Sequence, residues 1–468
     1  MINETNKEHL LMGRRLTLPT DRGRQSVICR SQATCRPASF NQEWHLSTNH
    51  NEPGSKQYHM SVSFEVNGLL DLAALNEAIS EVLLRHDVFR TSFLKAEGQY
   101  VTEVRRRDTF QIDTASVHSA PINNINDAKK YATDYSGERF DLTADTLLRC
   151  LYIQLSPLHA LLTFVTHHIV FDGWSASVLF AELSQLYNSL TARRTVHLTD
   201  LPIQYSDFAI WQRQLLSGCD LDLETNYWEQ RIAGCSNLHI AFPLREVTAV
   251  GVVKYFNIDE HLFTHLLAVC AACRTTLSTV MLTAYLVTLS VFYNIDFPLV
   301  YLAGANRSRT ETHPVIGFFS SCLLVGSKLT NDLRLCEIVR RVHACLFETL
   351  RHENQHISSI RALEPFRRQF KYTFHEEKLE NSCVLQTVSD TGLSITRTFI
   401  SGPQTNPSRM ISLSVYPSSA RIRGQFQFHS AAYSDEAMQM IVQNFVSILH
   451  LLVAQRQATL GQVELQLR

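Results

Sequence analysis

The chain has 468 residues, of which 45% are hydrophobic and 19% are charged. This composition is typical of a globular protein and excludes a largely disordered one. The formal net charge is only -1, so there is no overall electrostatic reason to bind nucleic acid or an anionic membrane. Chains longer than about 300 residues usually form more than one hydrophobic core, and we therefore expect two large lobes.

The cysteines and the N-terminus bear on the cellular compartment. The 11 cysteines follow no regular spacing, and the first residues lack the basic and apolar blocks of a secretory signal peptide. We therefore expect reduced thiols and a cytoplasmic protein. Residues 1–37 have no clear periodicity and carry several arginines. We interpret them as a variable, flexible extension, with a docking segment for an acidic partner as the alternative.

The first half of the chain alternates predicted strands with predicted helices. Asp71 is a suitable N-cap for a helix over Leu72–Arg85, whose apolar residues recur at helical spacing. A second helix is expected over Ala176–Leu190. The predicted strands cover His59–Val66, Val88–Phe93, Gln99–Val104, Leu147–Leu155 and Ala160–Thr166.

The second half repeats this mixture of helices and strands. Predicted helices cover Leu262–Cys273, Leu277–Tyr293, Leu335–Leu350 and Asp435–Gln455, and predicted strands cover Leu299–Ala303, Ile411–Val415 and Arg423–His429. Residues 277–293 are strongly apolar, but the run is short for a membrane span, so we expect a buried helix and no membrane span. The sequence thus predicts an α/β (α+β) fold of two related lobes, residues 38–205 and 206–468, divided near residues 195–225.

The run from His167 to Ser175, HHIVFDGWS, is the most informative stretch for chemistry. It follows the predicted strand Ala160–Thr166, and adjacent residues of a strand point to opposite faces. We expect His167 to pack inward and support the loop, and His168 to face the site as general base. An imidazole of ordinary pKa, about 6.5, is mostly neutral at cell pH and can accept a proton.

Asp172 and Ser175 each have two interpretations. Asp172 either orients the imidazole of His168, as in a catalytic triad, or forms a buried ion pair that shapes the loop. We favour the ion pair, and the sequence offers Arg307, directly after a buried strand. Ser175 is interpreted as a helix start rather than a nucleophile, since the chain has no Gly-x-Ser-x-Gly elbow.

Metal and phosphate sites are not indicated. Cys270 and Cys273 form a C-x-x-C pair on an apolar helix, with His265 nearby, but no second cysteine pair follows. We therefore expect core packing rather than zinc binding. A glycine-rich phosphate loop is also absent from the sequence.

Several motifs in order resemble those of the condensation domains of nonribosomal peptide synthetases, whose signature is HHxxxDG. The second motif of that family, RHExLRTxF, is similar to Arg85–Phe93, and YxDFAxWQ is similar to Tyr205–Gln212. Weaker matches are Ser39–Trp44, Phe140–Leu142, Leu147–Arg149 and Ile316–Phe319. The ordered set covers about residues 38–468 and is more specific than the histidine run alone.

The resemblance implies two lobes, each like chloramphenicol acetyltransferase, in a V-shaped pseudo-dimer with the active site in a tunnel between them. A donor acyl group would arrive on the 4'-phosphopantetheine arm of a partner acyl or peptidyl carrier protein, and the chain itself would bind no cofactor. The acceptor, a small molecule or carrier-bound group, would offer an amine or a hydroxyl. Because no adenylation or carrier region is attached, the chain looks free-standing and would meet its carrier in trans.

The resemblance also implies roles for individual residues. His168 maps to the catalytic histidine, and Asp172 to a structural aspartate that pairs with an arginine of the second lobe, here Arg307. The Gly173 backbone N–H is expected to position the thioester or stabilise developing negative charge. Four residues are expected to support the site, namely Trp174, Ser175, Arg90 and Ser321.

Departures from the family pattern keep alternatives open. Ser320-Ser321-Cys322 replaces the family's V-N-T, a later arginine is replaced by Gly326, and two late motifs within residues 353–370 are barely recognisable. We expect Ser321 to alter the inner wall near the channel. The alternatives are an epimerisation-type domain, a CoA-dependent acyltransferase on the same fold, and a non-catalytic carrier-binding scaffold. The stretch Trp174–Leu179 favours the condensation subtype over the DGVSWR typical of epimerisation domains.

Overall fold

The computed structural model describes residues 28–31, 35–51, 58–106, 110–116, 122–195, 198–216, 219–233, 235, 251–353, 370–374, 392–398, 400, 411–418 and 420–467. Most of the extension expected over residues 1–37 lies outside these ranges. The late motif segments within residues 354–369 also lie outside them.

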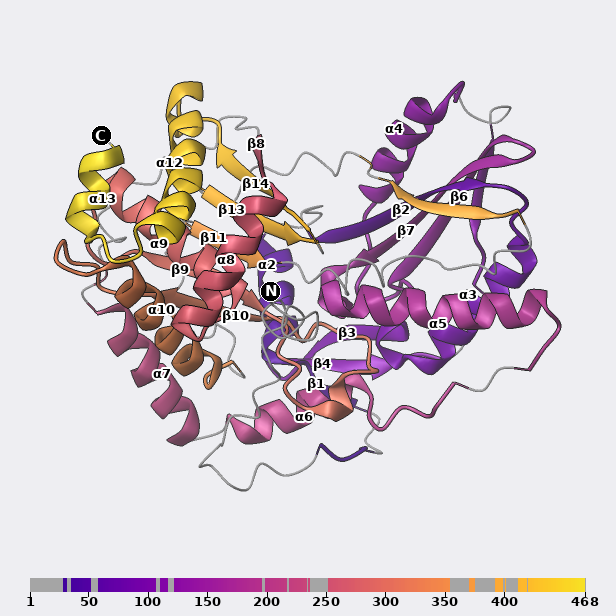
Figure 1. The fold of residues 1–468 in the computed structure, drawn as a ribbon. Coiled ribbons are helices and arrows are strands. Elements are labelled where there is room, and N and C mark those ends of the chain that lie inside the picture. Colours follow the sequence, from indigo (N-terminus) through magenta and orange to yellow (C-terminus); the bar gives the residue numbers. More distant parts are fainter. Residues whose placement is uncertain are drawn as a thin grey trace.

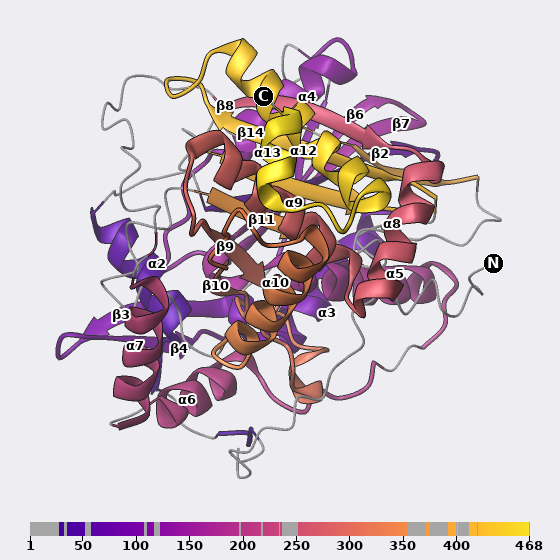
Figure 2. The ribbon, with the colours of Figure 1, turned by 60° about the vertical axis from the view of Figure 1, so that its left-hand side comes forward.

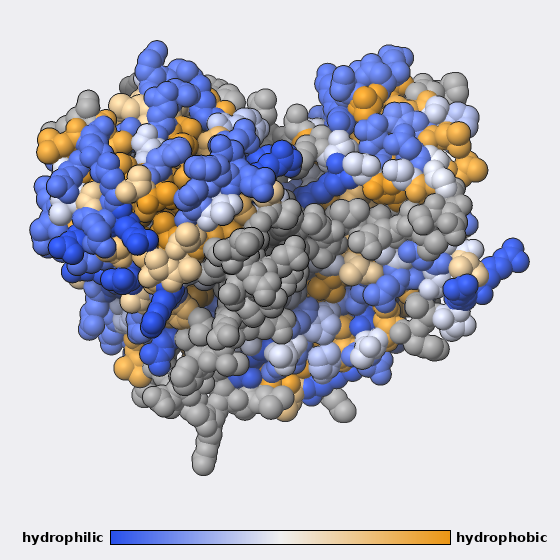
Figure 3. All heavy atoms as spheres, viewed as in Figure 1, coloured by the Kyte–Doolittle hydropathy of each residue, from blue (hydrophilic) through white to orange (hydrophobic). Residues whose placement is uncertain are grey.

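The described chain forms two lobes, which Figure 1 shows side by side, and each lobe has its own hydrophobic core. Most buried hydrophobic side chains between the N-terminus and Trp211 belong to the first core. Most of those from Trp228 onward belong to the second. The cores therefore divide between these two tryptophans, later than residue 205. The outline of the molecule is notched at the top between the two lobes (Figure 3), which agrees with a V-shaped arrangement.

A five-stranded sheet forms the centre of the N-terminal lobe, with the strand order β12-β2-β7-β6-β5. Its strands are β2 (His59–Asn67), β5 (Asp113–Ser116), β6 (Leu148–Ser156), β7 (His159–His167) and β12 (Ser394–Thr398). Helices α3 (Leu72–Arg85) and α5 (Gly173–Thr191) pack against each other, and α4 (Ile125–Ser136) contacts β2, β6 and β7. The predicted N-cap is confirmed, because Asp71 Oδ1 accepts a hydrogen bond from the Ala74 N–H at 3.0 Å.

A small sheet in the order β1-β4-β3 and two helices complete this lobe. The elements are β1 (Cys35–Pro37), α2 (Phe40–Asn51), β3 (Thr91–Ala96), β4 (Gln99–Val104) and α6 (Tyr205–Leu215). The strand predicted over Val88–Phe93 is wrong in its first half, where a 3-10 turn covers Asp87–Arg90. The Thr91 hydroxyl donates to the Asp87 carbonyl at 2.9 Å and closes this turn. A short buried run does not distinguish a strand from such a turn by its periodicity.

A six-stranded sheet in the order β10-β9-β11-β13-β14-β8 forms the C-terminal lobe. Its strands are β8 (Gly251–Ile258), β9 (Leu299–Gly304), β10 (Ser321–Gly326), β11 (Phe370–Phe374), β13 (Ile411–Pro417) and β14 (Ile422–His429). The helices are α7 (Cys219–Ile232), α8 (Glu260–Cys273), α9 (Leu277–Tyr293), α10 (Leu335–Leu350), α12 (Asp435–Ala454) and α13 (Leu460–Leu467). Figure 2 shows α9, α10 and α12 in front of this sheet.

Two segments of the second half of the chain belong to the N-terminal lobe. Strand β12 pairs antiparallel with β2, and residues 315–319 are buried in the N-terminal core. In the second segment, Gly317 packs directly on Tyr205 of α6. A Cβ added to this glycine would lie 2.0 Å from Tyr205 Cδ2, so the close approach requires glycine at position 317.

The apolar helices of the C-terminal lobe pack into its hydrophobic core. Thirteen residues of α9 are buried, as predicted for Leu277–Tyr293, and Cys270 and Cys273 are buried in the same core. In the part of the chain that the structure describes, only α12 is by itself long and apolar enough to cross a membrane. Helices α8 and α9 are long and apolar enough only when taken together, and a bend of 97° separates them. The apolar face of α12, from Met438 to Leu452, is buried in the core of this lobe.

Candidate active site

His168 lies where a strand gives way to a helix. Strand β7 ends at His167, a 3-10 turn covers His168–Val170, and α5 begins at Gly173. The His168 N–H donates to the Tyr58 carbonyl at 2.8 Å, which fixes the turn against the neighbouring chain segment. The half-buried side chain of His168 is therefore held on a rigid part of the backbone.

The hydrogen bond of His168 determines its tautomer. Nδ1 lies 2.6 Å from the Phe171 carbonyl oxygen, and a carbonyl can only accept a hydrogen bond. In the neutral ring the proton must therefore be on Nδ1, which leaves Nε2 as the unprotonated nitrogen. This is the tautomer that a general base needs, with the other nitrogen held by a backbone oxygen.

The electrostatic surroundings keep His168 neutral. Burial lowers its pKa below the ordinary value of 6.5, and the positive charge of Lys371 lowers it further. The Phe171 carbonyl and the charge of Asp172 act in the opposite direction, but they do not outweigh burial. His168 is thus ready to accept a proton near neutral pH.

His167 has a structural contact, as the sequence predicted for the inward-facing member of the pair. Its Nδ1 accepts a hydrogen bond from the Ile169 N–H at 3.1 Å, and the side chain is buried. Burial lowers the pKa of His167 to about 3, with smaller contributions from His59 and His168. Because Nδ1 accepts this hydrogen bond, the proton of the neutral His167 ring is on Nε2, and no unprotonated nitrogen is left to act as a base.

The other walls around His168 come from residues that the motif did not identify. The ring of Phe318 lies 4.5 Å from the His168 ring, and that of His45, on α2, lies 5.6 Å from it. The Asn41 side-chain amide donates to the carbonyls of Phe318 and Ser320, each at 3.0 Å. Helix α2 therefore holds the segment before β10 against His168. Only the weak resemblance at Ser39–Trp44 pointed to α2.

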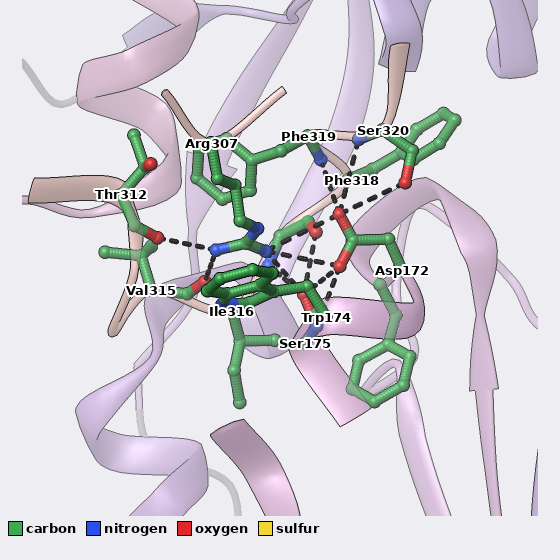
Figure 4. Close-up of polar contacts among 12 residues, drawn as sticks. Asp172, Trp174, Ser175, Arg307, Thr312, Val315, Ile316, Phe318, Phe319 and Ser320 are labelled. Atoms are coloured by element: carbon green, nitrogen blue, oxygen red, sulfur yellow. Dashed lines mark hydrogen bonds and ion pairs between the residues drawn. The ribbon is translucent and has the colours of Figure 1, made fainter. Parts of the chain in front are cut away.

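Asp172 is a buried junction between the lobes, shown in Figure 4. Its Oδ1 accepts from the Ser175 N–H at 2.8 Å and from Arg307 Nη2 at 3.2 Å. Its Oδ2 accepts from the Phe319 N–H at 3.1 Å and the Ser320 N–H at 3.3 Å. The ion pair with Arg307, favoured from the sequence over a triad, is thus present in the structure.

Arg307 donates hydrogen bonds to two backbone carbonyls as well as to Asp172. Its Nη1 donates to the carbonyls of Thr312 at 2.5 Å and Val315 at 2.7 Å, and its guanidinium lies 4.1 Å from the centre of the Phe319 ring (Figure 4). Burial lowers its pKa, whereas the charge of Asp172 raises it. This pair fixes the segment leading to Phe318, so it sets one wall of the site indirectly.

The three residues that follow Asp172 differ in their surroundings and contacts. Helix α5 begins at Gly173 with Asp172 as N-cap, so the helix start expected with Ser175 before Ala176 is three residues too late. The buried Ser175 hydroxyl is bonded within the Asp172 cluster and accepts from the Gly317 N–H at 3.0 Å. Trp174 Nε1 donates to the His313 carbonyl at 3.0 Å. Gly173 is exposed, and a Cβ added there would meet no heavy atom within 4 Å.

The structure does not bring Arg90 to His168. Its guanidinium donates to the carbonyls of Leu83 and Arg105 at 2.8 and 2.6 Å, and to Asp87 Oδ1 at 2.7 Å. It therefore ties the end of α3 to the turn before β3. The sequence motif identified Arg90, but it did not show that this side chain holds the turn before β3 rather than the surroundings of His168.

Ser321 is the first residue of β10 and is buried. The register pairs it with Gly304, and its Oγ would lie 2.8 Å from a Cβ on that glycine. Strand alternation puts Ser321 on the same face as Leu323 and Cys322 on the opposite face. The role of Ser321 beside the expected channel stays a prediction.

Two surface cavities lie away from His168. The cavities, of about 390 and 430 Å³, are lined by residues around Arg90 and Arg85 and do not include His168. Among the residues the structure describes, no group of three or more His, Cys, Asp or Glu side chains is arranged to hold a metal ion. The tunnel expected between the lobes stays a prediction.

The chain is similar to known proteins along most of its length. The family model described as "Condensation domain" matches residues 32–467. The beauvericin nonribosomal cyclodepsipeptide synthetase of Gibberella fujikuroi is 33% identical over 309 residues, which cover 65% of this chain and 10% of that protein. The enniatin synthase of Fusarium equiseti is 26% identical over 412 residues, which cover 85% of this chain and 13% of that protein. The chain therefore spans only a small part of the length of these relatives.

Two solved structures share the arrangement of the two lobes. The X-domain from teicoplanin biosynthesis matches with a TM-score of 0.75 at 19% identity, over 94% of this chain and 99% of that one. The first condensation domain of the calcium-dependent antibiotic synthetase matches with a TM-score of 0.72 at 15% identity, over 92% of this chain and 99% of that one. At these identities the similarity establishes the fold.

Proposed function

Because the chain belongs to the condensation-domain family, we propose that it joins a carrier-bound acyl or peptidyl thioester to an acceptor amine or hydroxyl. The donor would be held on the phosphopantetheine arm of an acyl or peptidyl carrier protein. One relative is named a tripeptide synthetase and another a cyclodepsipeptide synthetase, so the proposal includes both amide and ester products. The arm belongs to the carrier, and we propose that the chain itself needs no bound cofactor and acts in the cytoplasm.

The protonation state of His168 carries this proposal. Its Nδ1–H is held by the Phe171 carbonyl at 2.6 Å, and burial keeps the pKa of the ring below 6.5. A non-catalytic scaffold has no need for an imidazole held neutral with Nε2 unprotonated. An acyl-transfer enzyme does, because the acceptor must lose a proton as it attacks.

The proposed reaction uses few protein groups. The acceptor nitrogen or oxygen attacks the thioester carbonyl, and His168 Nε2 takes the proton that the acceptor loses. The carbon–sulfur bond then breaks, and the protonated imidazole returns the proton to the leaving thiolate. The N–H of Gly173, at the positive end of α5, would stabilise the negative charge on the carbonyl oxygen.

The test is a product assay with an acyl-loaded carrier protein and a panel of acceptor amines and alcohols, read by mass spectrometry. We expect product from the native protein and a loss of about 10²–10⁴-fold in rate for His168→Ala, the typical contribution of general acid–base catalysis. His159→Ala is the matched control, because His159 lies at the other end of β7, the strand that leads to His168, and pairs with Glu65 at 2.8 Å. Equal rates for His168→Ala and the native protein would remove the base assignment, and tight carrier binding without any product would favour a scaffold.

A further inference from the structure

Residues 315–320 belong to no helix or strand, and most of them are buried in the core of the N-terminal lobe. Buried backbone N–H groups outside regular structure need other acceptors, and side chains of this lobe supply them. The Gly317 N–H donates to Ser175 Oγ at 3.0 Å, and the Phe319 N–H donates to Asp172 Oδ2 at 3.1 Å. Individual side chains therefore hold this segment in place.

His86 is a third acceptor for the same segment. Its side chain is completely buried, and its Nδ1 lies 3.3 Å from the Ile316 nitrogen. Because a backbone N–H can only donate, Nδ1 must be the unprotonated nitrogen of the ring. The proton is then on Nε2, which donates to Glu182 Oε2 at 2.8 Å. Glu182 also accepts from Arg85 Nε at 2.9 Å, so its buried charge has a cation partner. Glu182 therefore fixes the tautomer in which His86 can hold Ile316.

The backbone at His86 is also held, because this residue ends α3. Its N–H donates to the Val82 carbonyl at 3.0 Å. Its carbonyl accepts from the Phe89 N–H at 3.3 Å, within the 3-10 turn that follows. Arg90, at the end of that turn, donates to the Leu83 carbonyl of α3 at 2.8 Å. Arg90 therefore supports the junction that carries His86.

The segment that His86 holds lies next to the candidate base. Ile316 stands two residues before Phe318, whose ring lies 4.5 Å from the ring of His168. Phe318 is only 5% exposed, so its ring is enclosed on this side of the imidazole. The Phe171 carbonyl holds Nδ1 of His168, and Phe318 packs beside the same ring. A displacement of Phe318 would therefore leave the imidazole free to tilt about that hydrogen bond.

We propose that His86 is a positioning residue for His168. Its Nδ1 holds the Ile316 N–H, which keeps the Phe318 ring against the imidazole of His168 and keeps Nε2 of that imidazole in place for proton transfer. This inference rests on the proposed acyl transfer, in which Nε2 takes the acceptor's proton. His86 itself contacts neither the substrate nor the transferred proton. A residue that only filled the core would affect stability, whereas a positioning residue affects the rate of the chemical step.

The first experiment tests the two ring nitrogens of His86 separately. In His86→Asn the side-chain oxygen can replace Nδ1 and accept from Ile316, whereas in His86→Gln the amide can replace Nε2 and donate to Glu182. We expect kcat for His86→Asn to stay close to the native value. For His86→Gln we expect kcat to fall by about 10–10²-fold with KM nearly unchanged, the loss that a small misplacement of reacting groups causes. His352→Gln is the matched control, because His352 also pairs with a glutamate, Glu224 at 2.7 Å, but in the C-terminal lobe, and its kcat should not change.

The second experiment measures the placement of His168 without any product. In protein with isotope-labelled histidine, we expect the magnetic resonance signal of the His168 Nδ1–H to be nearly unchanged in His86→Asn and shifted in His86→Gln. A protein in which an ester replaces the amide between Val315 and Ile316 lacks only this one N–H. It should show the same shift and the same fall in kcat, and it tests the contact even if His86→Gln does not fold.

The outcomes separate this inference from the proposed function. Equal kcat for the two His86 variants, or a greater loss in His86→Asn, would overturn the positioning role. An unchanged His168 signal in the ester protein would overturn it as well. Absence of product from the native protein would instead contradict the proposed function, and the resonance measurement would then decide the role of His86 alone.

Discussion

Arg307 Nη2 lies 3.2 Å from Asp172 Oδ1, and each side chain is only 1% exposed. The two residues are 135 positions apart and belong to different halves of the chain. Asp172 caps α5 through the Ser175 N–H, and it also accepts from the backbone of Phe319. The ion pair thus connects the helix that follows His168 to the segment that places Phe318 against His168.

Breaking this pair should destabilise the whole protein. We expect Arg307→Met to lower the free energy of unfolding by about 3–5 kcal/mol, because it leaves a buried carboxylate without its cation. Urea denaturation followed by circular dichroism measures the loss. Lys328→Met is the control, since Lys328 pairs with Asp296 at 3.8 Å while more than half of each side chain is exposed and such pairs contribute about 0–1 kcal/mol. A loss below about 1 kcal/mol for Arg307→Met would contradict the assigned role.

The pH dependence of the rate should follow His168. Its neutral form accepts the proton, and its pKa lies below 6.5. With an alcohol acceptor, which does not titrate near neutral pH, we therefore expect kcat/KM to level off above pH 6.5 and to fall at lower pH, as the ring becomes protonated. In Lys371→Met the acidic limb should move toward higher pH, because a positive charge that lowers this pKa is removed. A single-turnover pH profile for both proteins tests this, and an acidic limb centred above pH 6.5 in the native protein would contradict it.

Stability should depend on pH through His167. Its pKa is about 3 in the folded protein and about 6.5 when unfolded, so below pH 6.5 the unfolded state binds more protons. Stability is therefore fully present above pH 6.5 and is lost as the pH falls, by about 1.4 kcal/mol per unit until the folded pKa is reached. His167→Gln keeps an acceptor for the Ile169 N–H but does not titrate. The variant should show a shallower loss between pH 7.5 and 5 than the native protein in urea denaturation, and identical slopes would contradict the assignment.

Replacement by alanine should affect the stability of the protein differently at two glycines near the site. At Gly317 the added Cβ would lie 2.0 Å from the Tyr205 ring, whereas at Gly173 it would meet nothing within 4 Å. We expect Gly317→Ala to lower stability by about 1–3 kcal/mol and Gly173→Ala to leave it nearly unchanged.

Activity should distinguish the same two variants. If the space at Gly173 receives the thioester, Gly173→Ala should lower kcat/KM although the protein remains folded. Thermal unfolding and the product assay, carried out on both variants, separate the two effects. Full activity in a folded Gly173→Ala protein would argue against a thioester at that position.

Local sequence patterns located much of this molecule. The cap at Asp71, the strand before His167 and the buried helix over residues 277–293 depend on neighbours in the sequence, and their periodicity was sufficient to find them. The Asp172–Arg307 pair was within reach because a buried carboxylate requires a cation. The start of α5 was misplaced because Asp172 serves at once as N-cap and as ion-pair partner.

The residues that sequence reasoning missed depend on contacts between distant segments. Phe318 contacts His168 only when residues 315–319, from the second half of the chain, pack into the N-terminal lobe, and Lys371, whose charge acts on His168, comes from the distant strand β11, so no local pattern identifies them. For Ser321 the motif gives a position in the chain but not a strand face, because the face depends on the register of β10 with β9. A shift of one residue in that register exchanges the two faces of a strand.

The pairing of β12 with β2 affects how the chain can fold during synthesis. Strand β2 is complete once residue 67 has been made, but its partner on that side extends from Ser394 to Thr398. For most of translation β2 therefore has an exposed edge, which is a site for pairing with other chains. A truncated chain that ends near residue 215 would keep this edge permanently and should associate or aggregate, even though it contains the histidine run.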